Sequence, residues 1–305
     1  MIRSLCFLPA ILVVAGCANG LTNDAPPATD YGCTLALEDN ATLELWREAE
    51  FSEQLTDPAA REFANCLGHP DPFLRDQIGY EGLSAALRSG QVSEPTRRAL
   101  ISDMRRQMFE IDSSGFRAPF AALGLSELVR TDRIAPFLRP EERIEIAEAT
   151  AVYLSSVRDF RAYSNIEGWR HGVAHGADLA MQLSLNPNVE AAALAALRQA
   201  IADQISGRSG HAFTHGEPER LARPIYFMAT REVFSRDDWS NWFQALATPA
   251  PLDDWAAAFQ SETDLARLHN LKAFARVLYI NSSRSENEAL KPVADGAHNL
   301  LKTLP

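Results

Sequence analysis

The sequence predicts an all-α protein. Past residue 40, apolar residues recur three and four positions apart, a spacing that places them along one face of a helix. Alanine, leucine, glutamate and arginine are frequent there, whereas the alternation of β-branched residues that is typical of strands is scarce. The gaps between the periodic stretches are short, which favours antiparallel neighbours. We therefore expect an irregular α-solenoid of stacked antiparallel helical hairpins.

About a dozen stretches carry the helical pattern. Breakers such as Gly90, Pro140 and Asn186-Pro187 fall between them, where a helix should stop. The expected helices cover residues 42–51, 58–67, 73–89, 96–111, 119–130, 141–157, 165–184, 189–206, 218–234, 237–247, 263–281 and 285–303.

One helix pair, residues 67–88, resembles a HEAT-type repeat, because a turn with proline and aspartate precedes its second helix. The other pairs keep this rhythm without a fixed period, so we expect a HEAT-like arrangement rather than a regular repeat array. The helical residues 41–305 can form one elongated domain, and two sub-domains that meet near residues 207–210 are the alternative.

The amino terminus has the pattern of a bacterial lipoprotein signal. Arg3 precedes an apolar stretch, residues 5–14, that is too short to span a bilayer. Val14-Ala15-Gly16-Cys17 resembles the lipobox, in which the cysteine is lipidated and cleavage leaves it first in the chain. We expect a signal peptide over residues 1–16 and a lipid on Cys17. The alternative is an ordinary cleavable signal.

Residues 17–40 are expected to form the lipidated cysteine and a flexible tether, because residues 18–30 are small, polar and proline-containing. The membrane would be a partner through this lipid anchor, in the bacterial cell envelope. In lipoproteins, an alanine such as Ala18 after the lipidated cysteine, rather than aspartate, implies the outer membrane. The helical domain would then face the periplasm.

Four cysteines occur in the chain. Cys6 would leave with the signal and Cys17 would carry lipid, so Cys33 and Cys66 remain as a pair in an oxidising compartment. We expect a disulfide between them. Two buried free thiols are the alternative.

The net charge of −11 makes nucleic acid an unsuitable partner, because a polyanion would be repelled. The sequence also has no run of lysine and arginine that could act as a local binding patch.

The stretch EGWRHGVAHGAD, residues 167–178, contains the first candidate site. On a continuous helix, Glu167, His171, His175 and Asp178 would share one face. Ser164 followed by Glu167 matches a capping box, so this helix is expected to begin near Asn165. Two imidazoles four residues apart can reach one ion, with Asp178 as a third ligand. A divalent metal is therefore one hypothesis, and structural hydrogen bonding or general acid-base chemistry are the others.

The same helix would carry Trp169 and Val173 on the opposite side, where they are expected to enter the core. Gly168, Gly172 and Gly176 would form a stripe that allows another helix to approach closely.

A second polar cluster follows at His211, Thr214, His215, Glu217 and Arg220. Thr214 and Glu217 again match a capping box. Because neighbouring helix pairs touch in a solenoid, this loop is expected to lie over the first cluster. The predicted polar pocket then contains Glu167, Trp169, His171, His175, Asp178, His215, Glu217 and Arg220.

These residues resemble a bacterial family of domains of unknown function, DUF2785, whose signature is Gly-Trp-x-His-x-x-Ala-His-x-Ala-Asp. The resemblance rests on residues 158–179, Leu74-Arg75-Asp76 and residues 213–221, and spans most of the chain after the signal. Arg161, Gly168, Trp169, His171, His175 and Asp178 occupy signature positions, while Arg170 stands where other members often carry a small residue. The resemblance implies a helical fold and no activity.

The sequence favours an envelope lipoprotein whose α-solenoid is a binding or scaffold module, since stacked helical hairpins form concave surfaces for a protein or small-molecule ligand. No known catalytic set is complete. One alternative is a metal-dependent hydrolase in which His171, His175 and Asp178 hold the ion and Glu217 or Glu167 transfers protons. The other is a purely structural envelope protein.

Overall fold

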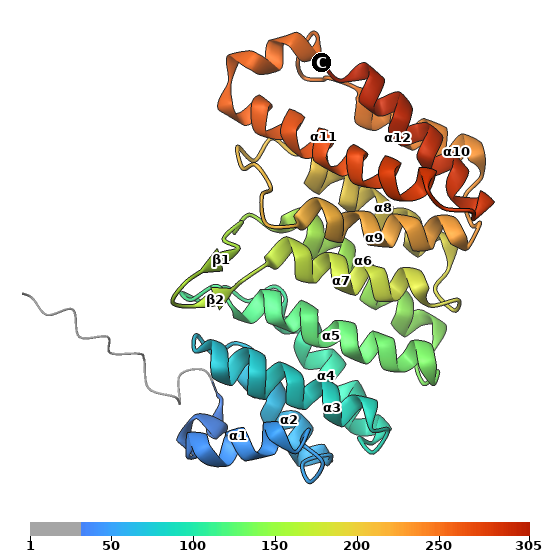
Figure 1. The fold of residues 1–305 in the computed structure, drawn as a ribbon. Coiled ribbons are helices and arrows are strands. Elements are labelled where there is room, and N and C mark those ends of the chain that lie inside the picture. The colour runs from blue at the N-terminus through green and yellow to red at the C-terminus, as the bar shows by residue number, and fades with distance from the viewer. Residues whose placement is uncertain (1–31) are drawn as a thin grey trace, which may run out of the picture.

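The fold is described by a computed structural model that covers residues 32–305 (Figure 1). These residues are predominantly helical, which confirms the all-α prediction. The predicted signal peptide, the lipidation site Cys17 and most of the predicted tether lie outside the described residues. Within residues 32–305, no helix has both the length and the apolar character needed to span a bilayer.

The helices follow the predicted ranges closely at all but one position. Their bounds are α1 Asn40–Glu48, α2 Asp57–Cys66, α3 Glu81–Arg88, α4 Glu94–Gln107, α5 Arg117–Ile134, α6 Pro140–Ser156, α7 Gly172–Leu185, α8 Ala191–Ser206, α9 Glu217–Thr230, α10 Arg236–Ala247, α11 Glu262–Ser283 and α12 Lys291–Thr303. A π-helical segment, Phe73–Tyr80, leads directly into α3, and short 3-10 segments cover Thr34–Leu37, Trp255–Gln260 and Glu288–Leu290.

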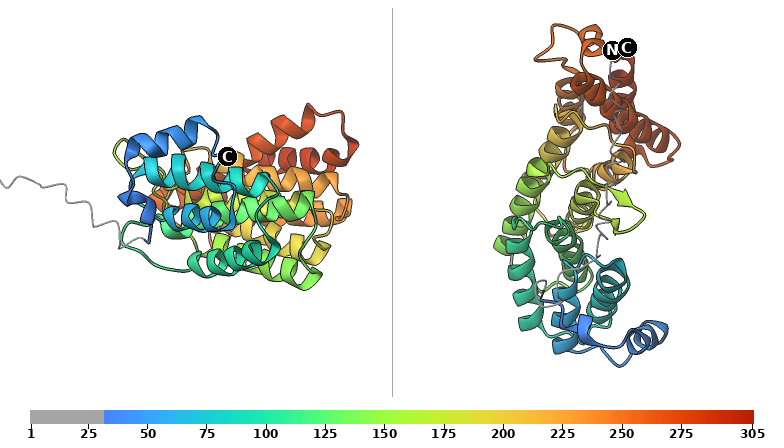
Figure 2. Two further views of the ribbon diagram at one scale, coloured as in Figure 1. Left: turned by 90° about the horizontal axis from the view of Figure 1, so that it is seen from below. Right: turned by 90° about the vertical axis from the view of Figure 1, so that its left-hand side faces the viewer.

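The helices are stacked in two layers. Helices α5, α7, α9 and α11 follow one another in the front layer of Figure 1, and each contacts the next. Helices α4, α6 and α8 lie behind them. The views in Figure 2 show that the stack is elongated, with α1 and α2 at one end and α10 to α12 at the other. Every inner helix therefore has neighbours along the stack and across the layers.

Local sequence explains where several helices begin. The hydroxyl of Ser93 accepts a hydrogen bond from the amide of Thr96, and Pro95 occupies the first turn of α4. Ser235 and Asp238 form a reciprocal capping box at the start of α10. These side chains satisfy amides that lack a partner within the helix, so each start position is encoded locally.

The two layers approach each other closely where α7 crosses α6. A Cβ atom on Gly176 would lie 2.7 Å from Cδ2 of Leu154 and 2.9 Å from Cε1 of Tyr153, closer than real Cβ atoms come. Gly172 also lies against this helix, near Val157 and Tyr153. The predicted glycine stripe thus does allow close packing at these two positions.

The predicted disulfide is confirmed. Cys33 and Cys66 are bonded and almost fully buried, which fastens the start of the described chain to the end of α2. The bond lies within the hydrophobic core, so the 3-10 segment after Cys33 packs directly on the first helices.

The helix predicted over residues 165–184 is wrong in its first part. Residues 163–169 form a two-stranded antiparallel hairpin, with β1 Tyr163–Ser164 and β2 Gly168–Trp169, and Tyr163 pairs with Trp169. Ser164 does accept hydrogen bonds from the amides of Ile166 and Glu167, but these bonds close the turn of the hairpin. Gly168 has φ +72°, which favours glycine. Helix α7 therefore begins only at Gly172, and Glu167 does not share its face.

Candidate functional site

Arg170 ties the hairpin to the stack. Its guanidinium group donates two hydrogen bonds of 3.0 Å to the carboxylate of Glu167 and one of 2.8 Å to the carbonyl of Ser114. Its amide donates to the carbonyl of Ala162 at 2.7 Å. Arg170 is only 5% exposed, whereas the side chain of Glu167 is 40% exposed, so the guanidinium group is shielded from water while the carboxylate is partly solvated. The predicted capping role of Glu167 is therefore replaced by an ion pair.

Arg75 reaches the same hairpin from the π-helical segment. Its fully buried guanidinium group donates to the backbone carbonyl of Glu167 at 2.8 Å and to the carboxylate of Asp76 at 2.9 Å. The carbonyls of His69 and Pro70 accept its remaining bonds. Residues 74–76 and 158–179, which the family resemblance links in sequence, are thus in direct contact.

The ring of Phe116 joins the two arginines. The guanidinium carbon of Arg75 lies 4.0 Å from the ring centroid, and that of Arg170 lies 4.3 Å from it. Burial lowers the pKa of Arg75, but an arginine stays charged at any physiological pH. Asp76 and Glu167 balance the two charges, and the aromatic ring adds a cation-π attraction to each. We call Arg75, Arg170 and Phe116 the arginine clamp.

Trp169 is exposed on the hairpin, so the prediction that it enters the core is wrong. Its side chain is 39% exposed and stacks on the ring of His171, with centroids 4.1 Å apart and planes 3° apart. Tyr163 is the partner of Trp169 across the hairpin, and the centroids of their rings lie 4.8 Å apart. The error follows from the misplaced helix, because a strand directs its side chains differently. Val173 is buried, as predicted.

His171 lies at the junction between the hairpin and α7. Its φ is +54°, a left-handed conformation that non-glycine residues seldom adopt. The ring is partly buried under Trp169, and its Nδ1 atom is inaccessible and has no hydrogen-bond partner. Burial, with the nearby positive charge of Arg220, lowers the pKa of His171 to about 4. The imidazole is therefore neutral near pH 7.

His175 points into the interior. Its ring packs edge-on against Phe120 at 4.9 Å and makes a hydrogen bond to the backbone of Pro119. It is 6% exposed, and burial lowers its pKa to about 3. Its Nδ1 atom is buried and has no hydrogen-bond partner among residues 32–305, so the contact with Pro119 satisfies only one of the two ring nitrogens.

Asp178 is bound by two arginines from the next front-layer helix. Arg220 of α9 donates a hydrogen bond to its carboxylate, and Arg223 lies 3.8 Å away. Burial raises the pKa of Asp178, and Arg220 opposes this change. The ion pair connects α7 to α9 and uses the carboxylate that had been predicted as a ligand.

The loop before α9 does reach the first cluster. The exposed ring of His215 lies 6.1 Å from Trp169, edge to face, and the buried carboxylate of Glu217 accepts the amide of His215 at 2.8 Å. Thr214 bonds to the ring of His215 instead of capping the helix. Asn270 of α11 fixes the loop by bonding to residues 211 and 213. Glu217 lines a narrow crevice beside His171.

The predicted metal ligands do not form a metal centre. Across residues 32–305, no three side chains from histidine, cysteine, aspartate and glutamate are arranged to hold an ion. Asp178 is already paired with arginine, and His175 faces Phe120. The structure thus brings Trp169, His171, His215 and Glu217 together at one end of α7, and leaves His175 and Asp178 in packing contacts.

Sequence reasoning missed an apolar feature beside this cluster. Phe109 and Ile111, in the loop before α5, are 48% and 101% exposed, and Ile166 at the hairpin turn is 85% exposed. The loop contacts the hairpin through Ser114. Phe109 and Ile111 border an open cavity of about 340 Å³. Its other lining residues include Ala118, Pro119, Tyr153, Val157 and Gly172. The apolar periodicity breaks after Met108, and this break in the sequence could have indicated that Phe109 and Ile111 lie outside the core.

We expect the folded protein to lose stability as the pH falls from about 6.5 towards 4. An unfolded chain binds a proton at His175 near pH 6.5, whereas the folded chain does so only near pH 3, so folding is progressively disfavoured between these values. The slope for one histidine is about 1.4 kcal/mol per pH unit. Urea unfolding at several pH values gives the free energy of unfolding as a function of pH. This free energy should fall less steeply with decreasing pH in His175→Gln than in the unmodified protein, but equally steeply in the exposed control His298→Gln. An unchanged slope in His175→Gln would contradict the assignment.

Replacing Arg170 by lysine should destabilise the protein by about 1–3 kcal/mol, because lysine cannot make the bidentate bonds to Glu167, the bond to Ser114 or the ring stacking on Phe116. The matched control is Arg161→Lys, which changes an exposed ion pair with Asp159 and should cost less than about 1 kcal/mol. Urea unfolding of both variants provides the comparison. Equal losses would argue against the clamp.

Comparison with known proteins places the site in its family. The family model described as "Protein of unknown function (DUF2785)" matches residues 106–280, more than half of the chain. The match includes the signature residues 168–178 and excludes residues 74–76, so it is narrower than the resemblance had implied. No curated protein and no solved structure matches the chain. On the family match, this chain belongs to the DUF2785 family.

Proposed function

We propose that the protein is a lipid-anchored binding module of the bacterial envelope, with an α-solenoid as its scaffold. The stack of α5, α7, α9 and α11, backed by α4, α6 and α8, supports a HEAT-like solenoid, because each helix pair contacts mainly its neighbours. The lipobox-like residues 14–17 and the Cys33–Cys66 disulfide support an oxidising compartment outside the cytoplasm.

The observation that carries the proposal is the gathering of exposed apolar side chains around the hairpin. Tyr163, Ile166 and Trp169 on the hairpin and Phe109 and Ile111 on the neighbouring loop are all exposed. A soluble protein seldom exposes a group of large apolar side chains unless it uses them to bind. We call these five residues the docking surface.

The partner that fits the docking surface is a protein segment with a bulky aliphatic or aromatic side chain. The cavity beside Ile111 can take such a side chain. The contacting rings of Tyr163 and Trp169 offer a second apolar contact on the hairpin. Exposed Arg158 lines this cavity, and exposed Arg161 lies beside Gly115 at its edge. Aromatic residues and arginine around an apolar centre are the composition of protein interfaces.

The arginine clamp preorganises this surface. A two-stranded hairpin is marginally stable alone, yet here Arg75 and Arg170 both hold Glu167 in its turn, and the amide of Arg170 bonds to Ala162 at its base. A surface that is already ordered loses less conformational entropy on binding. The buried arginines thus keep the exposed docking surface beside them ordered before a partner binds.

Photo-cross-linking in the producing bacterium tests the proposal. With a benzophenone amino acid at Ile111, we expect one discrete protein adduct, and adding Ile166→Asp should lower its yield tenfold or more, because a charge would enter the apolar contact. A tenfold loss corresponds to about 1.4 kcal/mol of binding free energy.

The matched control is Val152, which is 58% exposed on the rear helix α6. A benzophenone at Val152 should give no such adduct, and Val152→Asp should leave the Ile111 adduct unchanged. The proposal fails if both positions give the same adducts, if only lipid is cross-linked, or if Ile166→Asp has no effect in a variant with native stability.

A further inference from the structure

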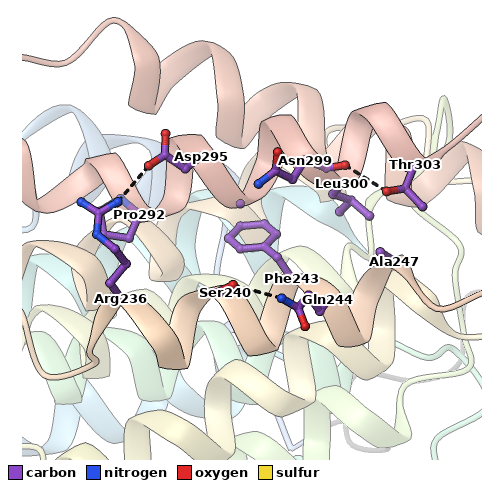
Figure 3. A pocket seen from close by; sticks show the side chains of 11 residues that line it. Arg236, Ser240, Phe243, Gln244, Ala247, Pro292, Asp295, Asn299, Leu300 and Thr303 are labelled. Carbon is purple, nitrogen blue, oxygen red and sulfur yellow. Dashed lines mark hydrogen bonds and ion pairs between the residues drawn. The ribbon is translucent and has the colours of Figure 1, made fainter.

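The carboxy-terminal end of the stack contains a groove between α10 and α12, away from the hairpin (Figures 1 and 3). Its volume is about 300 Å³. Helix α12 lies beyond the residues that match the family, so half of this groove is not part of the family region. We call it the terminal groove.

Close contact between the two helices forms the floor of the terminal groove. Figure 3 shows the ring of Phe243 standing between them. A Cβ atom on Gly296 would lie 2.0 Å from Cδ2 of that ring, so only glycine allows this approach. Leu300 and Ala247 extend the apolar floor. The groove is therefore built by the packing of specific residues.

The walls carry uncharged hydrogen-bonding side chains on both sides. Ser240 and Gln244 line the groove from α10, and Asn299 and Thr303 line it from α12 (Figure 3). Within residues 32–305, the side-chain amide of Gln244 bonds only to the hydroxyl of Ser240, at 3.2 Å. The amide of Asn299 makes no hydrogen bond within the described residues. Each amide offers both a donor and an acceptor, which is the combination that a peptide backbone needs.

Size and charge restrict the occupant. The stripe from residue 236 to residue 247 is about 16 Å long at 1.5 Å per residue, which an extended peptide spans with about five residues. A helical peptide would not use the wall amides, because its backbone N–H and C=O groups are already bonded to one another. Arg236 and Asp295 form an ion pair of 3.0 Å across one end and cancel each other's charge. The groove is thus electrically neutral in an acidic protein.

We infer that the terminal groove binds a short extended, uncharged peptide segment, with the amides of Gln244 and Asn299 bonding to its backbone from opposite walls. Alternate side chains of an extended peptide point in opposite directions, so every second one would face Phe243 and Leu300. Apolar residues at alternate positions are therefore the expected ligand sequence. This site is independent of the docking surface, because the two share no residue.

A library of acetylated and amidated hexapeptides, presented to the full chain, tests this inference. We expect enrichment of peptides with alternating apolar residues. For the most enriched peptide, Asn299→Leu and Gln244→Leu should each raise the Kd tenfold or more, whereas Gln199→Leu on the exposed face of α8 should not change it. Methylating the peptide's backbone nitrogens one at a time should weaken binding at alternate positions, because each methyl group removes one donor.

The inference is overturned if no hexapeptide is enriched, if the enriched peptides bind the two leucine variants as well as they bind the unmodified protein, or if backbone methylation is tolerated throughout. Both side chains are exposed, so these variants should keep the native circular dichroism and unfolding midpoint. An Ile166→Asp variant should retain peptide binding, which separates failure here from failure at the docking surface.

Discussion

Two guanidinium groups, those of Arg75 and Arg170, lie on the ring of Phe116 in the interior of this protein. Burying two like charges is costly unless each is paired and fully hydrogen-bonded. Asp76, Glu167 and four backbone carbonyls supply those partners. Two of these partners, the carboxylate and the backbone carbonyl, belong to Glu167 in the hairpin. The two guanidinium groups can therefore make all their hydrogen bonds only when the hairpin is in place. The position of the hairpin therefore follows from the need to compensate these charges.

The rest of the site is arranged around that constraint. Holding the hairpin against α5 places Trp169 over His171, and the left-handed backbone of His171 turns the chain into α7. Asp178 then meets Arg220, which fixes α9 against α7. The side chains left exposed include five large apolar ones: Tyr163, Ile166 and Trp169 on the hairpin, and Phe109 and Ile111 on the neighbouring loop. Arg170, His175 and Asp178 are used in contacts within the protein, whereas the exposed apolar side chains form the proposed docking surface.

Helix positions could be predicted because apolar periodicity and breakers such as Gly90 and Asn186-Pro187 are local features of the sequence. The disulfide could be predicted because only two cysteines remained. The hairpin was missed because the spacing of His171 and His175 indicated a helix, although Asn165, Gly168 and the aromatic residues around them are typical of a turn between strands. The inward orientation of His175 and the burial of Arg170 depend on Phe120 and Phe116, which are distant in sequence, so no local pattern could indicate them.

Hydrogen exchange of the Arg170 amide, which bonds to Ala162 at the base of the hairpin, tests most directly whether the clamp holds this region. In an Arg75→Lys variant we predict that this amide exchanges at least a hundredfold faster than in the unmodified protein, while amides in α11 keep their rates. Equal rates for the Arg170 amide in both proteins would contradict the account, because the hairpin would then be ordered without the arginine that lies 92 residues before Glu167 in the chain.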